Sequence, residues 1–200
     1  LLVEGYEFQP LYANPYNPPY YKELFENYGF KNYFNQNSYI WRANISEANE
    51  RIFDRAERLL SIPGYHVENI DMNNLEEAAE NFRLVYNKAW ALFSGVKPMT
   101  REEALEMLHE MKPLIDPNII FFAYFNDEPI GFFITVPDLN CIIGRFNGKF
   151  GLWQKLQLMW ELKVRKRSSR IFGIIFGIAP EFHGKGVESA IMVRYWHFMM

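Results

Sequence analysis

The segment "NIIFFAYFNDEPIGFFITVP", residues 118–137, constrains the fold more than any other part of the chain. Two runs rich in β-branched and aromatic residues flank the turn residues Asn126-Asp127-Glu128-Pro129. Such runs favour extended strands, and a short polar turn between two of them favours their direct pairing. The segment therefore predicts a β-hairpin with antiparallel strands.

Strand-like and helical patterns surround this hairpin. The strand patterns are 65–71 and 169–180, and the helical patterns are 73–93, 99–114, 147–163 and 186–198. From Gly64 onward the order is strand, two helices, hairpin, inserted helix, strand, glycine loop and helix. Strands that alternate with helices in this way are typical of a mixed α/β architecture. We therefore expect the α/β (α+β) fold class.

The inserted helical segment carries an apolar stripe. Its members are Leu152, Trp153, Leu156, Met159 and Trp160. A stripe at helical spacing is the usual mark of a face that packs on a core, so core packing is the preferred interpretation. A lid over an acceptor entrance is the alternative.

The first 63 residues differ in character from the rest. Residues 1–21 are dense in Pro and Tyr, which favours extended and turn conformations. Residues 20–28 predict a short helix that leads into a strand at 30–41, and residues 44–60 predict a charged amphipathic helix that we assign to a linker, 43–63. The tetrapeptide Pro18-Pro19-Tyr20-Tyr21 includes a pattern read by proline-binding modules, although a rigid turn explains it equally well, so a peptide-interaction protein is a third hypothesis.

Composition excludes several classes of function. The chain has 200 residues and a formal net charge of -3, which argues against a general affinity for nucleic acid or for anionic membranes, although a local basic patch is compatible with it. For the basic run Lys163–Arg170, a solvated connector is the preferred interpretation, and contact with a ligand phosphate or with an acidic acceptor is the alternative. The single Cys141 cannot form an internal disulfide, and no apolar run is long enough to span a bilayer. We expect a cytoplasmic protein with no nucleic-acid or membrane partner; a homodimer is left open.

The segment "APEFHGKG", residues 179–186, places closely spaced glycines between a strand and a helix. Backbone N–H groups at such a helix start form a concavity that suits a phosphate or pyrophosphate. The spacing of Gly177 and Gly184 does not match the nucleoside-triphosphate loop, and Ser189 stands where the dinucleotide fingerprint needs its third glycine. The loop therefore indicates another kind of phosphate ligand.

Residues 181–186, Glu-Phe-His-Gly-Lys-Gly, resemble the pyrophosphate loop of the GCN5-related N-acetyltransferase (GNAT) superfamily, written Q/R-x-x-G-x-G/A. Glu181 departs from that pattern at its first position. The element order of residues 64–200 is also the one that this superfamily uses, and the local segments are similar to a poorly characterised bacterial branch. The resemblance implies a GNAT-like mixed, mostly antiparallel sheet flanked by helices, which forms an acyl-CoA-binding domain over 64–200, truncated after its glycine-loop helix.

The resemblance also implies an activity. It is that of an acyl-CoA-dependent N-acyltransferase, most simply an N-acetyltransferase, which uses acetyl-CoA or another acyl-CoA as cosubstrate and a small-molecule or peptide amine as acceptor. The amine attacks the thioester directly. The residues implied in acyl-CoA binding are Phe176, Gly177, Ile178, His183, Gly184, Lys185, Gly186, Val187 and Glu188, and the implied acceptor contacts are Asn87 and Trp90. His183 is expected either to donate to a phosphate oxygen or to cap the helix entrance.

No catalytic residue is assigned from the sequence. His66, His109, Glu68 and Asp138 are candidate bases by residue type alone, and the histidines have no metal-ligand spacing, so no metal site is expected. Residues 1–42 resemble the C-terminal helix and strand of a preceding GNAT-like unit in tandem. Phe25 stands there where the superfamily often has a tyrosine that protonates the leaving thiolate. A catalytically inactive CoA-binding or structural module is therefore the alternative to an enzyme.

Overall fold

A computed structural model describes residues 1–11, 14–40, 50–91, 93–165 and 170–199. The chain divides into two compact units. The unit that we call the sheet unit comprises Ala43–Pro137 and Ile171–Met200, and the unit that we call the insert unit comprises Leu1–Arg42 and Asp138–Arg170.

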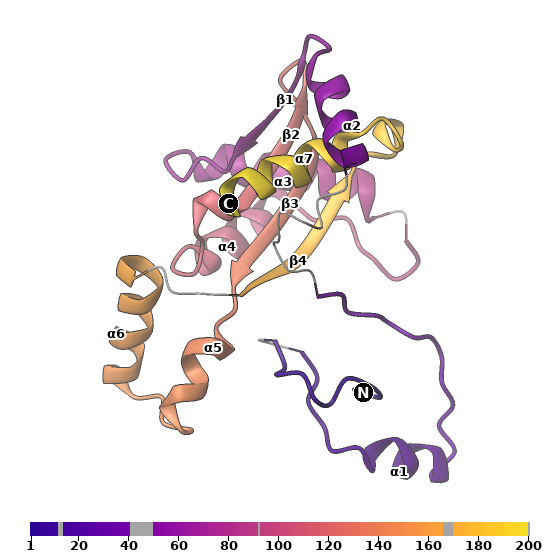
Figure 1. The fold of residues 1–200 in the computed structure, drawn as a ribbon, viewed down its shortest axis with the longest axis vertical. Helices are drawn as coiled ribbons and strands as arrows, with labels where there is room; N and C mark the ends of the chain where they lie inside the picture. The colour runs from indigo at the N-terminus through magenta and orange to yellow at the C-terminus, as the bar shows by residue number, and fades with distance from the viewer. Residues whose placement is uncertain (12–13, 41–49, 92, 166–169, 200) are drawn as a thin grey trace. The chain divides into compact units, whose positions relative to one another are not determined.

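The sheet unit is built on one four-stranded sheet (Figure 1). Its strands are β1 (Tyr65–Asn69), β2 (Ile120–Phe125), β3 (Glu128–Pro137) and β4 (Ile171–Ile178). They lie in the order β1-β2-β3-β4, and each neighbouring pair is antiparallel. The expected α/β fold class with an antiparallel sheet is thus confirmed.

The predicted hairpin is β2 and β3, with a tighter turn than the sequence indicated. Glu128 and Pro129 already belong to β3, so only Asn126 and Asp127 connect the strands. Both have a positive φ, 50° and 63°. This conformation matches the twist of a two-residue hairpin, and Asn and Asp adopt it more easily than most residues.

Four helices accompany the sheet among the described residues. They are α2 (Glu50–Leu60), α3 (Leu75–Ala89), α4 (Arg101–Met111) and α7 (Val187–Met199), and a short 3-10 helix spans Pro117–Ile119. The side chain of Asn74 caps α3 by accepting from the Glu77 N–H. The predicted capping box of Thr100 and Glu103 is present at the start of α4.

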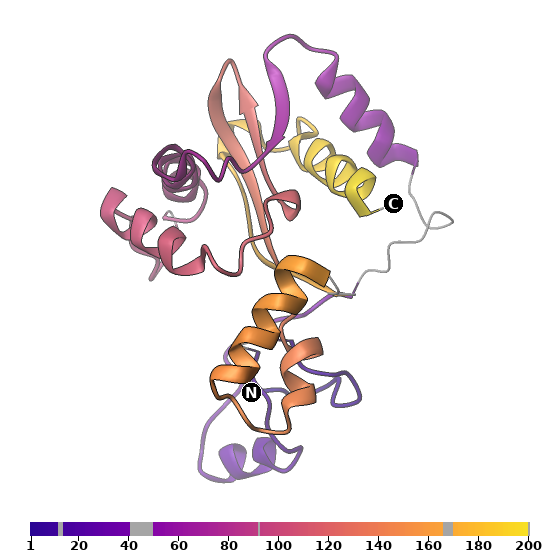
Figure 2. The same ribbon diagram turned by 90° about the vertical axis from the view of Figure 1, so that its left-hand side faces the viewer.

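The helices cover both faces of the sheet and create two cores. In Figure 2, α2 and the yellow α7 lie on one side of the sheet, and α3 and α4 lie on the other. The first core contains Ala56, Leu59, Phe121, Ala123, Val187 and Ile191, and the second contains Ala79, Phe82, Val85, Leu108, Phe122 and Phe132. Neighbouring residues of β2 enter opposite cores because successive side chains of a strand alternate between its faces.

Helix α2 contributes directly to the first core. We assigned this segment to a linker, yet Ala56 and Leu59 are buried against α7, while Ile52 and Leu60 are more exposed. The predicted start of this helix, residues 44–49, lies outside the described residues. The apolar stripe therefore joins α2 to the sheet unit through its small and medium-sized side chains.

The insert unit contains short helices and extended chain. They are α1 (Tyr21–Asn27), α5 (Asn140–Ile143), a 3-10 turn at Gly144–Phe146 and α6 (Leu152–Trp160), which continues as a π-helical turn over Glu161–Arg165. The helix predicted at 20–28 is confirmed as α1. The strand predicted at 30–41 is wrong over its described part, 30–40, which forms no strand. A strand needs a partner edge for its N–H and C=O groups, and no ladder pairs with these residues among those described.

The core interpretation of the apolar stripe on α6 is also wrong. Leu152 and Trp153 expose 76% and 74% of their surface, and Leu156 and Trp160 expose 56% each. The helix instead buries the face that carries Leu158 and Glu161. Helical periodicity shows that a helix has an apolar face, but it does not determine what lies against that face.

Candidate functional site

The candidate site lies where β4 ends and α7 begins. A short 3-10 turn, Pro180–Phe182, follows the strand, and residues 183–186 lead into α7. Gly184 and Gly186 have φ values of +72° and +100°, which strain any residue with a Cβ. A Cβ on Gly186 would also lie 3.3 Å from the Arg55 carbonyl oxygen of α2. Two glycines are therefore required to turn the chain here.

The backbone N–H groups of the loop divide into two sets. Those of His183 and Lys185 donate within the loop, to Pro180 O at 3.2 Å and to Phe182 O at 3.4 Å. In the described part of the chain, no acceptor is found for the N–H groups of Gly184, Gly186, Val187 and Glu188. The last two belong to the first turn of a helix, whose N–H groups have no intrahelical partner. The loop thus retains donors for an external acceptor.

The free edge of β4 has an unusual distribution of hydrogen bonds. Trp90 Nε1 donates to the Phe176 carbonyl oxygen at 3.2 Å, and His183 Nε2 lies 2.9 Å from the Ile178 carbonyl oxygen. A residue of an antiparallel strand directs its N–H and its C=O to the same side. The N–H groups of Phe176 and Ile178 therefore also point away from β3. This edge of β4 therefore presents N–H donors, while the side chains of Trp90 and His183 cover its carbonyl acceptors.

Gly177 allows Trp90 to lie against this edge. A Cβ at position 177 would be 2.9 Å from Phe132 Cζ and 3.1 Å from Trp90 Nε1. Contacts this short force a neighbour to move, and both neighbours here are rigid rings. The residue pair Trp90 and Gly177 thus connects α3 to the candidate site.

The charged side chains around the loop contact other side chains of the site. Lys88 Nζ lies 3.4 Å from Glu181 Oε1, and Lys185 Nζ lies 4.8 Å from the centroid of the Phe182 ring. The pKa of the Glu181 carboxyl is lowered by its own backbone N–H and by Lys88. The negative charge of Glu181 is therefore balanced by Lys88 of α3.

The two predicted acceptor contacts have different surroundings. Trp90 lies at the edge of β4, as described above. The Asn87 side chain accepts from Met99 N at 2.8 Å and donates to Met99 O at 2.9 Å. Both polar atoms of that amide already hold the segment that precedes α4, so its geometry accounts for a structural role.

The candidate bases do not converge. His66 and Glu68 belong to β1, which β2 and β3 separate from β4, and His109 is in the last turn of α4. The His66 ring stacks on Tyr124, with centroids 5.0 Å apart. The Tyr124 hydroxyl accepts from Asn81 Nδ2 at 3.2 Å, and burial raises its pKa. Tyr124 was not expected at a site, because a tyrosine within a strand pattern carries no distinguishing signal in the sequence.

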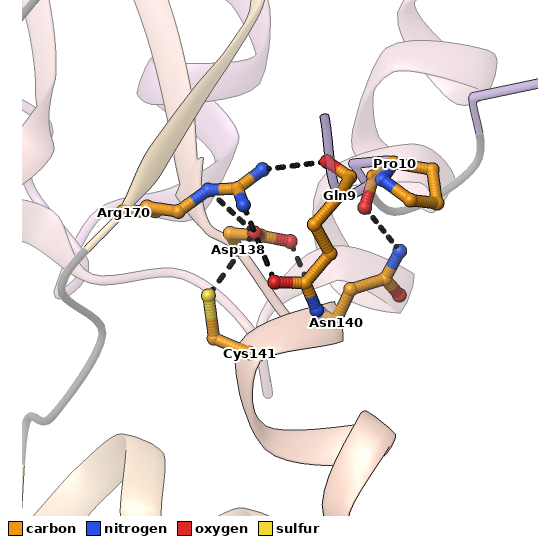
Figure 3. Close-up of polar contacts among 6 residues, drawn as sticks. All are labelled: Gln9, Pro10, Asp138, Asn140, Cys141 and Arg170. Atoms are coloured by element: carbon orange, nitrogen blue, oxygen red, sulfur yellow. Dashed lines mark hydrogen bonds and ion pairs between the residues drawn. The ribbon is translucent and has the colours of Figure 1, made fainter. Parts of the chain in front are cut away.

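Asp138 belongs to a separate polar network of the insert unit (Figure 3). Its carboxylate is fully buried; one oxygen lies 3.1 Å from Arg170 Nε and 3.2 Å from Cys141 Sγ, and the other accepts from Asn140 N at 3.0 Å. Burial and Asp138 both raise the pKa of the Cys141 thiol. These contacts occupy the carboxylate and keep the thiol protonated, so neither is a free base or nucleophile.

Among the described residues, no group of three or more His, Cys, Asp or Glu side chains is arranged to hold a metal ion. Among the same residues, no helix has the length and apolar character needed to cross a membrane.

Comparison with known proteins gives distant relatives. No protein-family model matches the chain. It is 23% identical over 197 residues to "Bacterial ceramide synthase" of Caulobacter vibrioides, which covers 98% of this chain and 50% of that protein. It is 24% identical over 186 residues to "Protein YghO" of Escherichia coli, which covers 91% of this chain and 46% of that protein. The chain thus spans about half the length of the curated relatives it matches.

Proposed function

We propose that this chain is the acyl-CoA-binding part of an N-acyltransferase of GNAT type, which moves an acyl group from a CoA thioester to an amine. The observation that carries the proposal is the set of N–H groups without an acceptor at Gly184, Gly186, Val187 and Glu188. They follow a strand edge that offers further donors. A diphosphate next to an extended amide chain and a thioester carbonyl has the complementary set of acceptors.

Each part of the site has a role in this proposal. The loop N–H groups and the positive end of α7 bind the diphosphate of CoA, and Lys185 adds a positive charge. The N–H groups of Phe176 and Ile178 donate to the carbonyl oxygens of the pantetheine arm and of the thioester. Trp90 and His183 cover the carbonyl oxygens of Phe176 and Ile178. The pantetheine arm therefore binds mainly through its own carbonyl oxygens.

The reaction needs no covalent enzyme intermediate. The amine nitrogen attacks the thioester carbon, the C–S bond breaks, and the sulfur leaves as the thiolate of CoA and takes up a proton. The amine must lose a proton to a base or to water before or during attack. Holding donor and acceptor in line supplies much of the acceleration. No side chain is assigned as the base.

A long-chain amine is the acceptor class that we favour. One relative is named a ceramide synthase, and a ceramide is the amide of a fatty acid with a long-chain amino alcohol. Formation of that amide from a thioester is N-acyl transfer. The relative's name therefore supports both the reaction type and a lipid amine, within the broader class of small-molecule amines.

Two measurements on the full-length protein test the proposal. Isothermal calorimetry with acetyl-CoA, palmitoyl-CoA and free CoA is expected to show binding of each, weakened at least tenfold by Gly186→Ala. Thiol release is then followed with each acyl-CoA in the presence of short amines, peptides and long-chain amino alcohols. The absence of CoA binding would refute the proposal.

A catalytically inactive relative is the second candidate. The separation of the candidate bases His66, His109 and Glu68 from β4 favours it, because none of these three lies beside the edge that would hold the thioester. Binding of acyl-CoA with no thiol release for any amine would identify this alternative.

A further inference from the structure

The insert unit exposes a cluster of large apolar side chains that we call the α6 surface. It consists of Phe150, Leu152, Trp153, Leu156, Trp160 and Val164. The least exposed of them, Phe150, still presents 49% of its surface to solvent. Isolated apolar residues are common on protein surfaces, but a contiguous group of this kind marks an interaction site.

Four residues of the α6 surface lie on one face of α6. Leu152, Leu156 and Trp160 are spaced by four residues and so lie in one row, and Trp153 lies beside that row. Leu158 and Glu161 belong to the opposite, buried face. The helix is therefore anchored in the insert unit by one side and presents its other side outward.

The segment that carries this face is rich in basic side chains. Between residues 139 and 165 the exposed charged side chains are all positive, namely Arg145, Lys149, Lys155, Lys163 and Arg165. The acidic residue of this segment, Glu161, is buried and pairs with Arg165 at 3.2 Å and with Arg145 at 4.0 Å. This local excess of positive charge contrasts with the net charge of -3 of the whole chain.

We propose that the α6 surface docks on an anionic lipid bilayer. Trp rings prefer the boundary between headgroups and acyl chains, aliphatic side chains enter the acyl region, and lysine stems extend their charges to the headgroups. Each Lys or Arg near an anionic surface adds attraction. With 9 α-helical residues, α6 is too short to cross a bilayer and lies along its surface.

Charge and side-chain type favour this occupant over two others. A second copy of the chain would bring the same positive charges against the α6 surface, and like charges repel. Single-stranded nucleic acid stacks on aromatic rings, whereas half of this surface, Leu152, Leu156 and Val164, is aliphatic and offers no stacking platform. The inference departs from the expectation that the protein has no membrane partner, because that expectation was based on total charge.

The biological purpose of this docking rests on the proposed function. A long-chain amine resides in a bilayer, so an enzyme that acylates it must reach the lipid surface. The docking itself is measured without any acyl donor or acceptor. Failure of vesicle binding therefore leaves the acyl-transfer proposal intact, and failure of CoA binding leaves the docking proposal intact.

The test is co-sedimentation of the full-length protein with vesicles. Vesicles of phosphatidylcholine with about one-third phosphatidylglycerol are expected to bind the protein at least tenfold more strongly than pure phosphatidylcholine vesicles, with binding that weakens as salt is raised. Trp153→Ser with Trp160→Ser is expected to reduce the partition coefficient at least tenfold. Lys149→Gln with Lys155→Gln is expected to reduce it about thirtyfold on the anionic vesicles.

A matched control uses exposed aromatic residues elsewhere in the insert unit. Tyr33 and Tyr39 expose 94% and 89% of their surface, so Tyr33→Ser with Tyr39→Ser removes two exposed rings outside α6. This variant is expected to bind anionic vesicles as the parent protein does. Equal loss of vesicle binding in this control and in the Trp153→Ser, Trp160→Ser variant would overturn the proposal.

Two further results would also overturn it. A fall in melting temperature of several degrees in the Trp153→Ser, Trp160→Ser variant would show that another part of the protein covers this face. Conversion of an oligomer to a monomer by the same variant, measured by analytical ultracentrifugation, would show that a second copy covers it. Unchanged stability and oligomeric state, with reduced vesicle binding, support the bilayer.

Discussion

Individual residues of the glycine loop differ in what they tolerate. Gly184 has open space where a Cβ would stand, whereas a Cβ on Gly186 would meet the backbone of α2. Both have a positive φ, so substitution strains the backbone at each position. Comparison of a substitution at Gly184 with one at Gly186 therefore separates the effect of backbone strain from the effect of a close contact.

Gly186→Ala is expected to lower the free energy of unfolding by about 2 to 3 kcal/mol, because strain adds to a contact with a backbone atom that moves little. Gly184→Ala is expected to cost about 1 kcal/mol through strain alone. Urea unfolding of both variants measures the difference. Equal losses would show that the Arg55 carbonyl imposes no constraint on the loop.

A second residue-scale expectation concerns Tyr195 of α7. Burial raises the pKa of Tyr195 from 10.0 to about 12, while its hydrogen bond with Thr135 acts in the opposite direction. In the unfolded chain the hydroxyl loses its proton near pH 10, and in the folded chain only near pH 12. The folded state therefore loses stability as the pH rises from about 10 to 12.

Tyr195→Phe is expected to remove this contribution, so that its unfolding free energy falls less steeply than that of the parent over the same pH range. Urea unfolding at intervals from pH 9 to pH 12 gives the two slopes. Tyr33→Phe, at a fully exposed position, serves as the reference. If Tyr195→Phe keeps the parental slope, the Tyr195 hydroxyl is not the group responsible.

At the scale of elements, one ion pair joins the two ends of the segment inserted between β3 and β4. We call this pair, Asp138 and Arg170, the neck of the insertion. Asp138 follows β3 and Arg170 precedes β4, and Asp138 N donates to Arg170 O at 2.9 Å. Arg170 also bonds to Gln9 O at 3.1 Å, so the neck holds the N-terminal segment as well (Figure 3). The network thus organises the insert unit around two residues at its boundary.

Asp138→Asn is expected to lower the free energy of unfolding by about 2 kcal/mol. Arg170 keeps its charge in this variant, while its partner becomes neutral. The loss should be local: hydrogen exchange should accelerate in α5 and α6 but not in β2 and β3. The pKa of the Cys141 thiol should fall, since Asp138 contributes to raising it, and this is measured by alkylation rates against pH.

The control for this variant is Glu76→Gln, which removes an exposed ion pair with Arg101 at 3.6 Å. Exposed pairs contribute little, so a change below about 0.5 kcal/mol is expected. Uniform acceleration of exchange across both units in Asp138→Asn would contradict a local role for the neck.

For the whole molecule, the distribution of buried residues shows which part carries the main cores. All residues of the two core clusters belong to the sheet unit. Among its described residues, the insert unit has few that are buried. The sheet unit therefore contains the apolar burial that a cooperative transition requires.

Replacing residues 139–169 by Asn-Gly is expected to leave a cooperatively folding sheet unit, because the backbone bond between Asp138 and Arg170 already brings the strands together as a hairpin requires. Circular dichroism melting and acyl-CoA calorimetry measure the outcome. Retained CoA binding with lost vesicle binding would agree with both proposals. Loss of the cooperative transition would show that the sheet depends on the insert unit.

Some features followed from the sequence because they depend on near neighbours in the chain. The hairpin of β2 and β3, the capping box of Thr100 and Glu103, and the glycines between β4 and α7 are set by backbone preferences within a few residues. Side-chain alternation and helical periodicity also identified residues that enter the two cores. These effects are local, so a linear sequence contains them.

Other features were decided only by tertiary structure. The bond between Arg170 and Gln9 joins residues 161 positions apart, and the covering of β4 carbonyls by Trp90 and His183 depends on how α3 and the loop pack on the strand. The apolar stripe of α6 was correctly placed on one face of a helix, yet that face is exposed. Periodicity defines a face, whereas packing partners from distant parts of the chain determine whether the face is covered.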